Sequence, residues 1–109
     1  MSLDFEDKAI ADALRELRIK KPHELQVEFI KRFFEHAHRT EKGYTVRMFA
    51  KNGELYIAKG EPYEKRQLLL HTLTILEDRG LVKVIICKGR KYIFMPLDVA
   101  EVFLKHLAT

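Results

Sequence analysis

The spacing of apolar residues predicts two amphipathic helices in the first third of the chain. In the first, apolar residues recur every three or four positions, which predicts a helix from Asp4, its N-cap, to about Arg18. The second begins at Pro22, which suits the first turn of a helix, and continues to about His38. Its apolar residues cover more than one stripe, so we expect a central helix buried against two neighbours. The apolar residues of this second helix are Leu25, Val27, Phe29, Ile30, Phe33, Phe34 and Ala37.

A third helix is predicted at about 61–79. Leu69, Leu73 and Leu76 lie at helical spacing on one face, which we expect to point into the core. Gly80 follows, and glycine is the usual residue where a helix ends in a left-handed conformation. This is the most clearly bounded helix of the sequence.

A β-hairpin follows this helix. β-Branched and aromatic residues are concentrated in 81–87 and 91–95, and the short segment Lys88-Gly89-Arg90 joins the two runs. Pro96 ends the second strand. The pattern therefore predicts a hairpin with a basic tip.

The stretch 43–60 is compatible with three structures. Asn52-Gly53 between two apolar runs favours a β-hairpin. The segment 45–51 also suits a short helix that stops at Asn52-Gly53. A third alternative is a strand at 44–49 followed by a short helix at 54–59. The sequence alone does not choose among them.

The chain ends in a helix predicted at about 98–108. Asp98, with Glu101 three residues later, is typical of a capping box. The two terminal helices carry more apolar surface than a small core ordinarily absorbs, so we expect a homodimer through one or both of them. Their apolar residues are Phe5, Ile10, Ala13, Leu14 and Leu17 in the first helix, and Phe103, Leu104 and Leu107 in the last.

Length and composition favour one domain spanning 1–109. The 109 residues suffice for a single core without disulfides, and the lone Cys87 cannot form an internal bridge, as expected in a reducing compartment. No apolar run is long enough to cross a membrane, and the acidic start lacks the order of a signal peptide, so we expect a cytoplasmic protein. Abundant Lys and Glu beside few Asn and Gln favour a thermophilic source. The net charge of +4 permits nucleic-acid binding without requiring it.

The block from Leu69 to Val82, with the basic segment Lys88-Gly89-Arg90-Lys91-Tyr92 and a trailing helix, resembles the recognition helix and wing of winged helix-turn-helix proteins. The resemblance covers about 61–107 and extends to the helix at 22–38. Before residue 61 the chain departs from the family pattern, because Asn52 to Pro62 is longer and more irregular than the short second helix and turn of most members.

This resemblance implies an α+β, mainly helical fold. It would be a winged helix-turn-helix with extra N-terminal and C-terminal helices. The recognition helix would occupy about 61–79, the wing about 81–95 and the C-terminal helix about 98–108.

The predicted recognition helix and wing carry residue types that bind DNA. Arg and Gln reach base edges with paired hydrogen bonds, whereas Lys, Thr and Tyr suit phosphates. An ordinary solvated helix face and a solubilising hairpin tip are the simpler alternatives. The candidate DNA-binding residues are Tyr63, Lys65, Arg66, Gln67, His71 and Thr74 on or before the helix, and Lys88, Arg90 and Lys91 on the wing.

Sequence patterns typical of enzymes are missing. The chain has no glycine-rich phosphate loop, no His-Glu-x-x-His and no Cys-x-x-Cys. His36 and His38 are two residues apart and would point to different faces of a helix. We therefore expect no catalytic residues, no cofactor, no metal and no enzyme activity.

Two functions fit these observations. The first is a sequence-specific double-stranded DNA-binding protein acting as a transcriptional regulator, with a homodimer that repeats the recognition helix one DNA turn apart. The alternative is a winged-helix protein-protein interaction module within a transcription or replication assembly. Leu68 and Leu70, both expected to be exposed on the recognition helix, favour that alternative.

Overall fold

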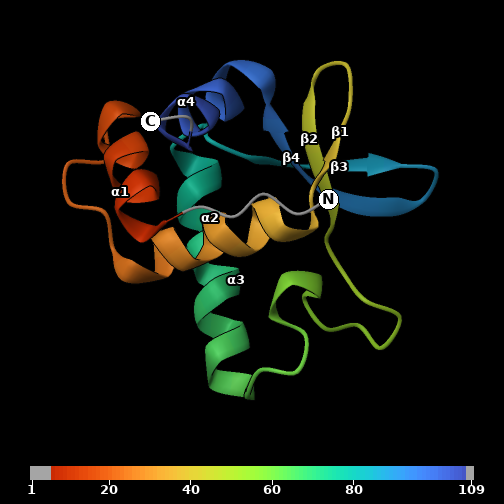
Figure 1. Ribbon diagram of the computed structural model, residues 1–109. Helices are drawn as coiled ribbons and strands as arrows, with labels where there is room; N and C mark the ends of the chain where they lie inside the picture. Colours follow the sequence, from red (N-terminus) through yellow and green to blue (C-terminus); the bar gives the residue numbers. More distant parts are fainter. Residues whose placement is uncertain (1–5, 108–109) are drawn as a thin grey trace.

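Four helices and a four-stranded sheet make up residues 6–107, the part of the chain that the computed structural model describes (Figure 1). About half of these residues are helical, so the predicted α+β class is confirmed. Asp4 and Phe5, which the sequence assigned to the first helix, lie outside the described residues. The elements are α1 (Asp7–Glu16), α2 (Glu24–His36), β1 (His38–Arg39), β2 (Gly43–Arg47), the 3₁₀ turn η1 (Tyr56–Ala58), α3 (Tyr63–Asp78), β3 (Lys83–Cys87), β4 (Arg90–Pro96) and α4 (Leu97–Leu107).

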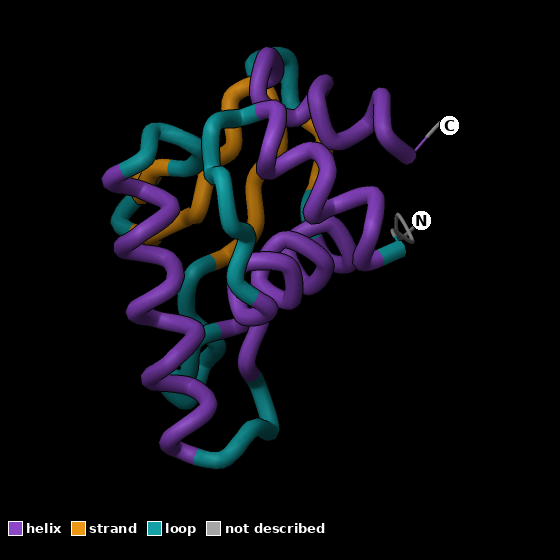
Figure 2. Tube along the Cα trace, turned by 90° about the vertical axis from the view of Figure 1, so that its left-hand side faces the viewer, coloured by secondary structure: helices purple, strands orange, loops and turns teal. Residues whose placement is uncertain are grey.

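The sheet joins segments that are far apart in the sequence. Its strand order is β1-β2-β4-β3, and each neighbouring pair is antiparallel. The register of β2 on β4 runs from Gly43 opposite Pro96 to Arg47 opposite Tyr92. Figure 1 shows the β3–β4 hairpin extending away from the helices, and Figure 2 shows the strands together in the upper half of the molecule.

Helix α2 lies at the centre of the core, as predicted. Phe29, Phe33 and Phe34 are at most 1% exposed. The ring of Phe34 lies 5.7 Å from that of Tyr44 in β2 and 5.6 Å from that of Phe103 in α4. One helix thus packs against both the sheet and the C-terminal helix.

The start of α2 differs from the prediction. His23 is the N-cap: its Nδ1 accepts a hydrogen bond from the Leu25 N–H, and Gln26 Oε1 accepts one from the His23 N–H. Pro22 therefore precedes the cap and is not in the first helical turn. The end of the helix also differs, because His38 belongs to strand β1 and pairs with Thr45 of β2.

The two terminal helices pack against each other. Ile10, Leu14 and Phe103 are fully buried, so much of the apolar surface expected to form a homodimer is covered within one chain. Glu16 of α1 accepts hydrogen bonds from Lys105 Nζ at 2.6 Å and from His106 Nε2 at 3.1 Å. These polar contacts close the edge of the helix pair.

The stretch 43–60 follows the third alternative most closely. Strand β2 ends at Arg47, a bridge joins Phe49 to Leu55, and the chain then forms η1. Gly43 is required at the start of β2, because a Cβ atom there would overlap the carbonyl oxygen of Met95. The start of β2 is therefore held close to the backbone of Met95 in β4.

The end of α3 and the turn of the hairpin have the expected glycines. After α3, the Gly80 N–H bonds to the Glu77 carbonyl and the Leu81 N–H to the Leu76 carbonyl, which together form a Schellman motif. In the hairpin, positive φ angles of 53° at Lys88 and 77° at Gly89 form a two-residue turn. The connection is thus one residue shorter than predicted, and Arg90 belongs to β4.

The start of α4 corrects another prediction. The helix begins at Leu97, directly after the last residue of β4, so Asp98 lies inside its first turn and is not the N-cap. Its Oδ1 accepts a hydrogen bond from the Val99 N–H at 2.9 Å. Among residues 6–107, no helix combines the length and the apolar character needed to cross a membrane.

Candidate nucleic-acid interface

The outward face of α3 carries four of the six candidate residues predicted there. Tyr63, Gln67, His71 and Thr74 are exposed, and their spacing places them along one side of the helix. The opposite side is buried, with Leu69, Leu73 and Leu76 at most 2% exposed. The rotation of the helix about its axis therefore agrees with the prediction.

Lys65 and Arg66 do not belong to this face. Lys65 Nζ lies 2.8 Å from Glu28 Oε2 of α2, and Arg66 Nη1 lies 3.6 Å from Glu54 Oε1 in the loop before η1. Lys65 lies four residues before Leu69 and Arg66 lies seven before Leu73, so at about 100° per residue both are on the side of the buried stripe and not on the outward face. Both cations are paired within the chain, so neither is a free cation on the outward face.

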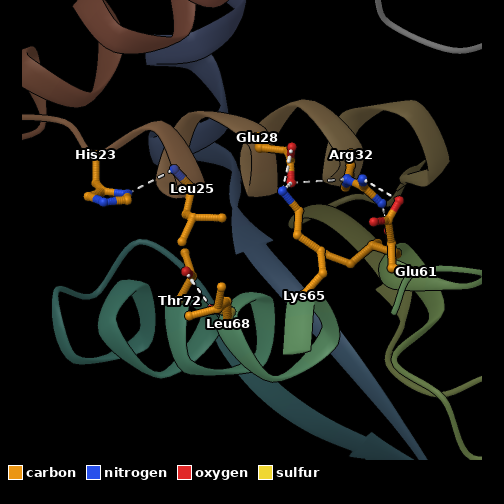
Figure 3. A network of polar contacts seen from close by, with 9 residues as sticks. His23, Leu25, Glu28, Arg32, Glu61, Lys65, Leu68 and Thr72 are labelled. Carbon is orange, nitrogen blue, oxygen red and sulfur yellow. Dashed lines mark hydrogen bonds and ion pairs between the residues drawn. The ribbon is translucent and has the colours of Figure 1, made fainter. Parts of the chain in front are cut away.

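The pair formed by Lys65 is part of a larger network (Figure 3). Arg32 of α2 contacts Glu61 Oε1 at 3.1 Å and donates to the Ile57 carbonyl at 2.9 Å. Glu28 Oε2 lies 3.6 Å from Arg32 Nε. The network ties η1 and the first turn of α3 to the central helix, and so orients the candidate recognition helix.

The exposed charge on α3 itself is acidic. Glu64, Glu77 and Asp78 are exposed, whereas both lysine and arginine of the helix are paired with carboxylates. One Glu77 oxygen also accepts a hydrogen bond from the Val84 N–H at 3.2 Å. Attraction to phosphates must therefore come from elsewhere on the surface.

The hairpin supplies that positive charge. Lys88, Arg90 and Lys91 are exposed, and no ion pair of the described residues includes them. Figure 1 shows the tip of this hairpin projecting beyond the helices. Ile86, opposite Lys91 in the register, is 71% exposed. The hairpin thus combines three free cations with one apolar side chain.

The apolar residues expected on the surface of α3 divide in two. Leu68 is 48% exposed. Leu70 is half-buried against the core and is not exposed as predicted. Only Leu68 is therefore available to a protein partner in the way that the sequence suggested.

Residues 6–107 contain no group of three or more His, Cys, Asp or Glu side chains that could hold a metal ion. Cys87 is exposed at the end of β3.

Comparison with known proteins assigns no family. No protein-family model, no curated protein and no solved structure matches the chain. The function of the surface must therefore be inferred from its own residues and geometry.

Proposed function

We propose that this protein binds double-stranded DNA sequence-specifically, as a winged helix-turn-helix protein that regulates transcription. The observation that carries the proposal is the hairpin tip, where Lys88, Arg90 and Lys91 are exposed and in no ion pair of residues 6–107, while the outward face of α3 is polar. The arrangement of elements supports it as well. Strands β2, β4 and β3 lie side by side in that order, and α3 leads directly into the hairpin that would be the wing.

The two parts of the surface have different roles in this proposal. The three cations of the wing bind phosphates and supply most of the affinity. The outward face of α3 enters the major groove, where the Gln67 amide can make paired hydrogen bonds to adenine. Gln67 therefore replaces Arg66 as the residue expected to read bases, because Arg66 is paired with Glu54.

A pair of neighbouring substitutions tests this assignment. We expect Gln67→Ala to cost about 1 to 3 kcal/mol on a site selected from random duplexes, and to relax the preference at one position. Arg66→Ala is the matched control and should leave the sequence preference unchanged. Affinities of both variants for selected and scrambled duplexes measure the difference. Loss of preference in Arg66→Ala, with Gln67→Ala unaffected, would contradict the proposed role of Gln67.

The second candidate function is a protein interaction module within a transcription or replication assembly. Leu68, at 48% exposure, and the acidic residues of α3 favour it, since both are unsuited to a phosphate surface. Duplex affinity separates the two functions. A defined transcription or replication protein that wild type retains and Leu68→Ser does not, in a protein that binds no duplex, would favour the module.

The homodimer belongs to the same proposal. With Ile10, Leu14 and Phe103 buried inside the chain, it would use the half-buried residues that remain, such as Leu104 and Leu107 of α4. Light scattering at about 0.1 mM, well above a micromolar dissociation constant, measures the mass. Twice the chain mass of 12.9 kDa supports the dimer, and 12.9 kDa contradicts it.

A further inference from the structure

The outer face of the sheet carries aromatic residues that the DNA proposal does not use. On β4, Tyr92 and Phe94 alternate with the fully buried Ile93 and Met95, so the two rings point away from the core. They are adjacent on this face because residues two apart on a strand share a side. The ammonium group of Lys83, on the neighbouring strand, lies 5.5 Å from the centre of the Phe94 ring.

Three hollows follow one another along this side of the molecule. The first, of about 430 Å³, includes Thr45, Tyr92 and Phe94 in its lining. The second, of about 250 Å³, shares Thr45 and Tyr92 with it and adds Arg47 and Tyr56. The third, of about 330 Å³, shares Arg47 and Tyr56. Each hollow shares lining residues with the next, and we call the three together the sheet track.

The sheet track is strongly basic. Lys42, Arg47, Lys51 and Lys59 line it, and no ion pair of the described residues includes any of the four. Within 6–107, Glu41 is the only carboxylate in the lining. The sheet track is therefore lined by four free cations and by the aromatic rings of Tyr56, Tyr92 and Phe94.

We propose that the sheet track binds single-stranded DNA. Unpaired bases stack on exposed aromatic rings, and a positively charged groove follows the phosphates of the strand. The rings of Tyr92 and Phe94 line a hollow, and the bases inside a duplex have no free face to stack on them because they already stack on each other. The charge of the track complements a polyanion, and its aromatic spacing gives successive bases a surface.

DNA is favoured over RNA by the apolar end of the track. Ile85, which is opposite Tyr92 in the register, and Cys87 line the first hollow. The C5-methyl group of thymine, which uracil lacks, makes apolar contacts of this kind. We therefore expect a thymine-rich strand to be the preferred ligand. This site uses the outer face of the strands, not the exposed lysines Lys88 and Lys91 near the hairpin tip, and it does not depend on the duplex proposal.

Fluorescence anisotropy with a labelled oligo(dT) of about 15 nucleotides, a length typical of single-strand sites, tests the proposal. Tyr92→Leu and Phe94→Leu remove a ring but keep apolar bulk, so the sheet should still form. Each is expected to weaken binding by about 5- to 100-fold, the range for one base stacked on one ring. Arg47→Gln should weaken binding less and lower its salt dependence.

The matched control changes the wing and not the track. A Lys88→Asn, Lys91→Gln variant should bind oligo(dT) within about twofold of wild type, while its duplex affinity falls, because Lys91 lies on the face of β4 that carries Ile93 and not on the face that carries Tyr92. In the wild-type protein, the chemical shifts of Tyr92 and Phe94 should change during the titration. The spectrum of each variant without ligand shows whether it is folded.

Three results would overturn the proposal. Unchanged affinity in both leucine variants would exclude stacking on these rings. Loss of oligo(dT) binding in the wing variant alone would place the strand on the wing. Binding of oligo(U) as tight as oligo(dT) would contradict the DNA assignment, since the methyl group is expected to contribute about three- to fivefold. Failure of duplex binding with intact oligo(dT) binding would refute the duplex proposal and leave this one standing.

Discussion

Replacing Leu73 with alanine should destabilise the domain far more than replacing its neighbour Thr74. Leu73 is 2% exposed and lies on the buried stripe of α3 with Leu69 and Leu76. The substitution removes three carbon groups, each worth about 0.8 kcal/mol on transfer from water. The cavity left behind adds to this, which brings the expected loss to about 2 to 5 kcal/mol. That is a large share of the roughly 5 to 15 kcal/mol that stabilise a small domain.

Urea denaturation followed by circular dichroism measures this loss. A lower midpoint with an unchanged slope reports a change in stability alone. Thr74→Ala is the control: Thr74 is exposed, and its hydroxyl donates only a long hydrogen bond of 3.4 Å to the Leu70 carbonyl, so we expect at most about 0.5 kcal/mol. Equal losses in the two variants would mean that α3 is rotated about its axis. The outward face assigned to DNA would then be wrong as well.

Three further predictions concern single contacts. Gly43→Ala should cost about 1 to 3 kcal/mol in the same melts, because the added Cβ meets the backbone oxygen of Met95, whereas native stability would show that the strands separate freely. The hydrogen bond from Lys105, with a further one from His106, lowers the pKa of Glu16 below its ordinary 4.5. The contact therefore stabilises the fold above about pH 4.5, and this contribution is lost as the pH falls through the folded pKa. The stability difference between wild type and Glu16→Gln should shrink between about pH 5 and pH 3, and a constant difference would contradict this linkage. Lys88→Asn should raise the melting temperature, since asparagine adopts the positive φ of this turn more readily than lysine, and a lower one would refute that reason.

The elements that could be predicted from sequence are those with local signals. Leu69, Leu73 and Leu76 before Gly80 define α3 because helical spacing and a C-terminal glycine are properties of one segment. The hairpin is equally local. The outward position of Gln67, His71 and Thr74 follows directly from the rotation that the leucines impose.

The predictions that failed depend on contacts between distant residues. Arg66 was expected on the outward face of α3, but it pairs with Glu54 on a separate loop, and no spacing within α3 reveals that partner. The Lys65–Glu28 pair is equally distant in sequence. His38 was assigned to the end of a helix, but it belongs to β1. The two residues of this strand pair only with β2, and no pattern within the segment reveals that pairing. Pairing across the sheet also selected the structure of 43–60 among three alternatives that local propensity left equal.

The salt dependence of duplex binding tests the proposed function most directly. If the wing binds phosphates, a plot of log affinity against log salt concentration is linear, and each contact contributes a slope of about −0.9. The Lys88→Asn, Lys91→Gln variant should reduce the steepness of that slope by about 2. We expect this variant to fold, because asparagine readily adopts the positive φ angle of position 88. A wild-type protein that binds no duplex more tightly than about 10⁻⁴ M at physiological salt, or a slope that the wing variant leaves unchanged, would contradict the proposal.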